Sequence, residues 1–173
     1  MRGLNLCSIL IGGAVLSCSP ALDWREVRPE GAGARVLFPC KPRSQARIAT
    51  IAASAVAMTM LACSAGGVTF ALSHAGLGDS TRATLALSEL RLALAANLNA
   101  SDVRTLAFGL PGMTPNPQAK QIWLSGRLPD GTLVQERAVL FVHGTHIYQT
   151  AMLGVQIDEA TAETFFDSLR LTP

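Results

Sequence analysis

The longest uncharged stretch of the sequence, residues 48–72, limits the possible folds more than any other feature. A run of this length without Asp, Glu, Lys or Arg is long enough to cross a bilayer as a helix. However, it is dominated by Ala, Ser, Thr and Gly, which gain little from contact with lipid, and Gly66-Gly67 interrupts it. The composition therefore favours β-strands, and a membrane helix is the alternative.

Two segments within this stretch have the pattern of strands. Larger and smaller side chains alternate from Val56 to Ala62, and residues 68–72 are rich in β-forming side chains. The segment 64–67 between them supplies turn residues, so the sequence predicts a β-hairpin. Because the stretch carries no charge, we expect both faces of these strands to be covered, as in the centre of a sheet.

Residues 1–17 are typical of a secretory signal peptide. One positive charge precedes an uncharged apolar run, residues 4–16, of the length that such signals need. Residues 14–18, Ala-Val-Leu-Ser-Cys, resemble a bacterial lipobox, in which the signal is removed before a cysteine that becomes lipidated. This pattern predicts a lipid on Cys18. Ordinary signal-peptidase cleavage after Ala21 is the alternative, because small residues also precede that position.

A lipidated Cys18 would tether the rest of the chain, residues 18–173, to a membrane. The length of this part fits a single domain. Ser19 follows the cysteine in place of the Asp that retains lipoproteins in the inner membrane of enteric bacteria. We therefore expect an exported protein on the periplasmic side of the envelope, with the outer membrane favoured.

The four cysteines can be sorted by position. Cys7 leaves with the signal and Cys18 takes the lipid, which leaves Cys40 and Cys63. Two remaining thiols in an exported chain predict one disulfide. The alternatives are two buried thiols or a metal or redox pair, but the sequence has no Cys-x-x-Cys motif.

The remaining residues show strand patterns and two helical patterns. Besides the hairpin, the predicted strands cover residues 22–27, 35–38, 122–128, 133–142 and 147–153. A helix is predicted over 81–99, with a buried stripe formed by Leu87, Leu90, Leu94 and Leu98. A second begins after Asp158 and has a stripe formed by Ala162, Phe165, Phe166 and Leu169. This order predicts an α+β fold, an antiparallel β-sheet flanked by two helices.

Three segments resemble the PsbP-like family of exported bacterial proteins. They are the strand and Pro-containing turn at residues 35–42, the strand around Tyr148, and the closing residues 165–171. The resemblance implies an α/β/α sandwich and a non-enzymatic assembly, docking or ligand-binding role. It assigns no functional residue, because the matching positions have the character of core and turn residues.

Composition and motifs exclude several classes of function. Lys and Arg number 14 against 12 Asp and Glu, and the basic residues are dispersed, so we expect no nucleic-acid partner. The sequence has no nucleophile elbow, phosphate loop, dinucleotide fingerprint or His-Glu-x-x-His motif. We therefore expect neither an enzyme nor a bound cofactor.

His143 and His146 are the candidate metal ligands. They flank a predicted turn, so their imidazoles could reach one face and supply two nitrogen ligands to zinc or copper. His74 and Tyr148 would complete a site only if folding brought them close. The alternative is two polar residues in a solvated hairpin turn.

A Pro- and Gly-rich segment, residues 109–118, predicts a long exposed loop whose larger apolar residues are Leu110 and Met113. These two are candidate contacts for a partner protein, because binding residues favour loops on rigid scaffolds. The expected function is that of a non-catalytic, envelope-anchored lipoprotein that docks onto or assists assembly of a partner complex. A periplasmic protein that binds a small ligand or a metal is the alternative.

Overall fold

The computed structural model describes residues 22–172. The predicted signal peptide, the lipidation site Cys18 and the alternative cleavage site after Ala21 lie outside the described residues.

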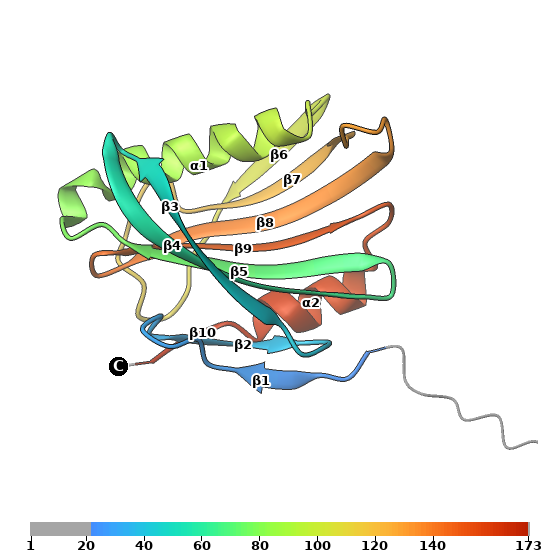
Figure 1. Cartoon of the computed structure of the whole chain (residues 1–173), viewed down its shortest axis with the longest axis horizontal. Coiled ribbons are helices and arrows are strands. Elements are labelled where there is room, and N and C mark those ends of the chain that lie inside the picture. The colour runs from blue at the N-terminus through green and yellow to red at the C-terminus, as the bar shows by residue number, and fades with distance from the viewer. Residues whose placement is uncertain (1–21, 173) are drawn as a thin grey trace, which may run out of the picture.

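The described chain forms two antiparallel sheets and two α-helices (Figure 1). The large sheet has the strand order β3-β4-β5-β9-β8-β7-β6, and the small sheet has the order β1-β2-β10. The strands are β1 (Arg25–Val27), β2 (Ala34–Phe38), β3 (Arg43–Ile51), β4 (Ser54–Ala65), β5 (Val68–Gly76), β6 (Asp102–Ala107), β7 (Lys120–Arg127), β8 (Leu133–His143), β9 (His146–Gly154) and β10 (Arg170–Leu171). The helices are a short 3-10 turn (Ser80–Arg82), α1 (Ala83–Asn97) and α2 (Glu159–Asp167).

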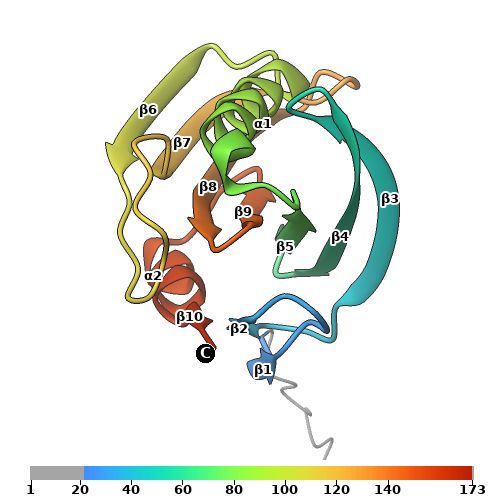
Figure 2. The same ribbon diagram turned by 90° about the vertical axis from the view of Figure 1, so that its left-hand side faces the viewer.

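The large sheet is strongly curved, and α1 lies inside the curve (Figure 2). We call the side that packs against α1 the concave face and the opposite side the convex face. Leu87 and Leu94 of α1, and Leu98 directly after it, are buried against strand residues of the concave face. The convex face is covered by α2 and by the small sheet, where Phe165 contacts Phe38 and Phe70 with ring-centroid distances of 5.5 and 5.2 Å. The two sides of the sheet therefore carry separate hydrophobic cores.

The α+β class predicted from the sequence is wrong, and so is the α/β/α sandwich. The described part of the chain is mostly β, with 50% of its residues in strands and 18% in helices, and its strands form two antiparallel sheets. The error arises mainly at the edge strands β3 and β6, whose side chains are almost all exposed. An edge strand without a buried face lacks the alternation of polar and apolar residues from which strands are predicted. A second sheet, rather than helices alone, covers the convex face.

The hairpin predicted within residues 48–72 is confirmed as β4 and β5, which turn at Gly66-Gly67. The membrane-helix alternative is excluded there, because strands occupy the whole segment apart from its turns. Among the described residues, no helix has both the length and the apolar character needed to span a bilayer. The expected covering of both faces holds for β5 but not for β4, where Met60 is 38% exposed.

A second turn, between β3 and β4, has no glycine. Ala52 and Ala53 have φ values of 49° and 60°, in the left-handed region that costs free energy for a residue with a Cβ. Two side chains from the α1 region hold this turn. The Arg82 guanidinium donates to the carbonyl oxygens of Ile51 (2.9 Å) and Ala52 (3.0 Å), and the Glu89 carboxylate accepts from the Ala52 N–H (2.7 Å). Tertiary contacts therefore stabilise a turn that local sequence disfavours.

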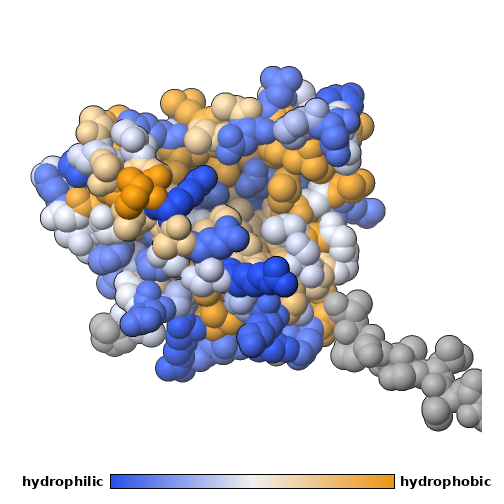
Figure 3. Space-filling view, viewed as in Figure 1, coloured by the Kyte–Doolittle hydropathy of each residue, from blue (hydrophilic) through white to orange (hydrophobic). Residues whose placement is uncertain are grey.

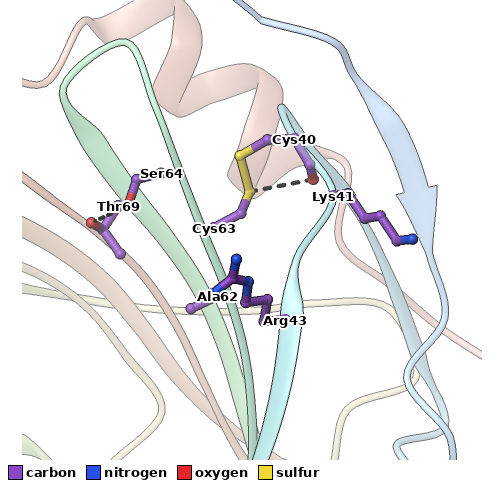
Figure 4. Close-up of a pocket in the computed structure, with 7 residues that line it drawn as sticks. All are labelled: Cys40, Lys41, Arg43, Ala62, Cys63, Ser64 and Thr69. Carbon is purple, nitrogen blue, oxygen red and sulfur yellow. Dashed lines mark hydrogen bonds between the residues drawn. A yellow bond between two sulfur atoms is a disulfide. The ribbon is translucent and has the colours of Figure 1, made fainter.

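The predicted disulfide between Cys40 and Cys63 is confirmed. Cys40 follows β2 of the small sheet and Cys63 lies on β4 of the large sheet, so the bond joins the two sheets (Figure 4).

Removal of this cross-link tests its contribution to stability. Closing a loop of this length restricts the unfolded chain, and the Cys40→Ala/Cys63→Ala variant is expected to lose about 3 kcal/mol of unfolding free energy. Urea unfolding of both proteins measures the difference, and reduction of the wild type should reproduce it. An unchanged unfolding midpoint after reduction would contradict this expectation.

Candidate ligand-binding groove

A groove of about 460 Å³ lies on the concave face, between α1 and the strands from β3 to β8. This volume falls within the ~300–1,000 Å³ range of small-molecule sites. Apolar side chains from both sides form most of its lining, among them Met58, Met60, Leu90, Leu94, Leu128 and Leu153. Figure 3 shows hydrophobic residues gathered over α1 and the strands directly beneath it, whereas hydrophilic residues predominate around β1 and β2.

Short side chains lie on the concave face of the central strands. The strand register places four alanines directly opposite one another in a single row across β4, β5, β9 and β8: Ala62, Ala71, Ala151 and Ala138. In the next row, the small Ser73 of β5 lies opposite Met60 and Gln149 and lines the groove. A larger residue at position 73 would therefore fill part of the groove.

Glu136 places a carboxyl group at one end of this groove. It lies on β8, its register partners are Leu124 and Leu153, and it is 8% exposed. Loss of hydration on burial raises the pKa of this carboxyl to about 7. Within residues 22–172, no hydrogen bond or ion pair reaches it. Such a group is a functional-site candidate, because a buried carboxyl without a partner destabilises the fold.

Arg47 is the other charged residue that lines the groove. It is exposed on β3, at the opposite side of the groove from Glu136. Four strand spacings separate β3 from β8, which is about 19 Å when measured along the sheet. The groove therefore has one charged residue near each end, and its other lining residues are apolar apart from Thr50, Ser73, Asn97 and Gln149.

A second hollow, of about 350 Å³, lies beside the disulfide (Figure 4). Lys41, Arg43, Ser64 and Thr69 line it, and each of these side chains is exposed or half-buried. The Sγ atom of Cys63 lies 3.3 Å from the Cys40 carbonyl oxygen. None of these lining side chains is a nearly buried charged group like that of Glu136. The groove under α1 is therefore the stronger candidate site.

The fold brings all three histidines to one end of the convex face. His143 and His146 are register partners next to the β8–β9 turn, and His74 lies on β5 beside Tyr148. The Nδ1 atom of His143 is 2.9 Å from the Gly112 carbonyl oxygen. Burial, together with the nearby His146, lowers the pKa of His74.

The predicted metal site is not completed by these neighbours. Within the described range, no three His, Cys, Asp or Glu side chains lie close enough together to hold a metal ion. The Tyr148 ring instead stacks on Phe141 with centroids 4.7 Å apart, and its hydroxyl donates to the Ala32 carbonyl oxygen. Metal binding by His143 and His146 stays a prediction.

Leu110 and Met113 lie in the loop between β6 and β7, as the sequence predicts. Both are half-buried and pack against the core of the convex face, and the Leu110 N–H lies 3.2 Å from the Met113 sulfur atom. Much of their surface is therefore used within the fold, and their role as partner contacts stays a prediction.

Sequence reasoning missed Glu136, although a signal was present. Alternate residues of β8 point to the concave face, and apart from Glu136 they are all apolar: Val134, Ala138, Leu140 and Val142. A single acidic residue at one of the inward-facing, otherwise apolar positions of a strand indicates a buried carboxyl.

The Glu136→Gln variant tests the burial of this carboxyl. Because burial raises its pKa, the unfolded chain releases the proton at lower pH than the folded protein does. Stability therefore falls as pH rises from about 4.5 to about 7, and the cost at pH 8 reaches about 3 kcal/mol. The glutamine side chain of the variant does not ionise, so its stability does not fall over this pH range. Urea unfolding should find the variant more stable at pH 8 and equal to the wild type at pH 4.

Glu163→Gln is the matched control, since Glu163 is exposed on α2, on the other side of the sheet. If Glu136→Gln and the wild type had the same unfolding free energy at both pH values, the Glu136 carboxyl would be hydrated in the folded protein.

Comparison of the sequence with models of known protein families finds no match, and comparison with curated proteins finds none either. The resemblance to the PsbP-like family stays a prediction, and the functional argument rests on the groove and its residues.

Proposed function

We propose that this chain is an exported, lipid-anchored, non-catalytic protein that binds an apolar small molecule in the groove beneath α1. The observation that carries the proposal is the groove itself, which combines a mostly apolar lining with a nearly buried carboxyl group, that of Glu136, that has no partner among residues 22–172. Ligand sites typically have this composition, with mostly hydrophobic walls and a few polar groups that orient the ligand.

Export is supported by two independent features. Residues 1–17 have the pattern of a signal peptide that ends before a cysteine. The Cys40–Cys63 disulfide fits a compartment outside the reducing cytosol. A protein held at a membrane by its N-terminus would meet amphiphilic molecules at high local concentration.

Docking onto a partner complex is the second candidate function. It is favoured by β6, an edge strand of the large sheet with Val103 42% exposed and Leu106 54% exposed. An edge strand has unpaired backbone groups that can pair with a strand of another protein. A stoichiometric protein that copurifies with the chain from the envelope supports docking, and recovery of the chain alone contradicts it.

Ligand binding can be tested with a neutral apolar fluorophore, N-phenyl-1-naphthylamine, which brightens in apolar surroundings. The wild type is expected to bind it saturably. Ala93 of α1 lines the groove, so Ala93→Phe should fill part of the space and weaken binding about tenfold. Ala96→Phe is the matched control, because Ala96 is exposed on the same helix and does not line the groove. Equal binding by the two variants would place the fluorophore elsewhere.

Lipid anchoring can be tested at Cys18. The Cys18→Ala variant is expected to lose palmitate incorporation and to leave the membrane fraction, because the lipidated thiol is absent. Metabolic labelling and fractionation measure both effects. Continued labelling of this variant would refute the lipobox prediction.

A further inference from the structure

We infer that Glu136 selects the ligand by its head group, and that the groove takes an apolar chain ending in a protonated amine. This inference rests on the proposed function, since it names the class of molecule that the same groove binds. The ammonium group would donate hydrogen bonds to the Glu136 carboxylate, and the chain would extend beneath α1 toward Met58 and Met60.

The Glu136 carboxyl group receives no hydrogen bond from the described part of the chain. Glu136 is 8% exposed, and its register partners on the adjacent strands, Leu124 and Leu153, cannot donate a hydrogen bond. The next charged side chain along the same strand, Arg137, points to the opposite face and pairs with Glu159 at 2.7 Å. A bound donor would restore the interactions that the carboxylate loses on leaving water.

The charges along the groove favour an amine over a carboxylic acid at this position. Arg47, the only other charged side chain among the described residues that line the groove, is four strands away from Glu136. A second carboxylate beside Glu136 would be repelled, because like charges in surroundings of low polarity interact strongly. An alcohol could donate a hydrogen bond but would leave the charge of Glu136 uncompensated, whereas an ammonium group satisfies both needs.

The apolar residues between the two charged ends fit the chain of such a molecule. Met58 and Met60 of β4 face Leu90 and Leu94 of α1 across the groove. Methionine side chains adapt to flexible hydrocarbon, so this lining accepts a linear chain without requiring one rigid shape.

Three eight-carbon probes with different head groups test the inference: octylamine, octanol and octanoate. Affinities are measured at pH 8 by calorimetry with the full chain, its Glu136→Gln variant and the Glu163→Gln control. Octylamine is expected to bind the wild type about tenfold more tightly than octanol does, and octanoate is expected to bind no better than octanol. Glu136→Gln should reduce the preference for the amine to within about twofold, while Glu163→Gln should keep it. Circular dichroism confirms that each variant is folded.

The possible outcomes separate the inference from the proposed function. Equal binding of octanol and octylamine by the wild type would overturn the inference and leave the groove a ligand site. An amine preference that persists in Glu136→Gln, or a preference for octanoate, would also overturn it. Failure of all three probes to bind the wild type would contradict the proposed function and the inference together.

Discussion

The packing of α1 inside the curved sheet is the interaction on which the other features depend. The start of the helix is tied to the β3–β4 turn by Arg82 and Glu89. Beyond its last turn, the Leu98 carbonyl oxygen accepts from the Arg127 N–H of β7 at 2.7 Å. Gly126 makes this approach possible, since a Cβ there would lie 2.3 Å from the same oxygen. The helix is thus held at both ends, and the groove lies along its side.

Glu136 differs from the other residues of this region because burial of its carboxyl lowers the unfolding free energy of the protein. Its raised pKa reflects burial of the carboxyl between Leu124 and Leu153, where no residue of the described chain donates a hydrogen bond to it. The acids at turns and helix starts behave differently. Asp79 and Asp158 accept hydrogen bonds from the backbone N–H groups of Thr81 and Thr161, which lower the pKa of each carboxyl. A buried group that destabilises the fold is understandable where a ligand needs it, and this contrast directs attention to the groove.

Features with a strong local signature could be predicted from the sequence. The β4–β5 hairpin follows from alternation and a Gly-Gly turn, and both helices follow from their apolar stripes. The disulfide follows from the count of cysteines left after export. What was missed depends on tertiary contacts. The Ala52-Ala53 turn is stabilised by Arg82, which is distant in sequence. Because this turn has no typical turn residue, the sequence did not indicate where β3 ends.

The candidate site was missed for a related reason. The sequence directed attention to histidines and to a loop, because these residue types commonly bind metals or partners. The groove instead arises where α1 lies against strands that are far from it in sequence, and no single segment indicates it. Of the described groove residues, only Glu136 could have been identified from local sequence, as an acidic residue at an inward-facing position of an apolar strand.

The most direct measurement is nuclear magnetic resonance of the protein with ¹³C-labelled methionine methyl groups during titration with hexadecylamine, whose chain is long enough to extend from Glu136 to β4. Met58 and Met60 line the groove, whereas Met113 and Met152 pack on the convex side and serve as internal references. Binding beneath α1 predicts saturable shifts of the Met58 and Met60 signals while the other two stay in place. Shifts confined to Met113 or Met152, or no shift at any concentration, would contradict a ligand site in the groove.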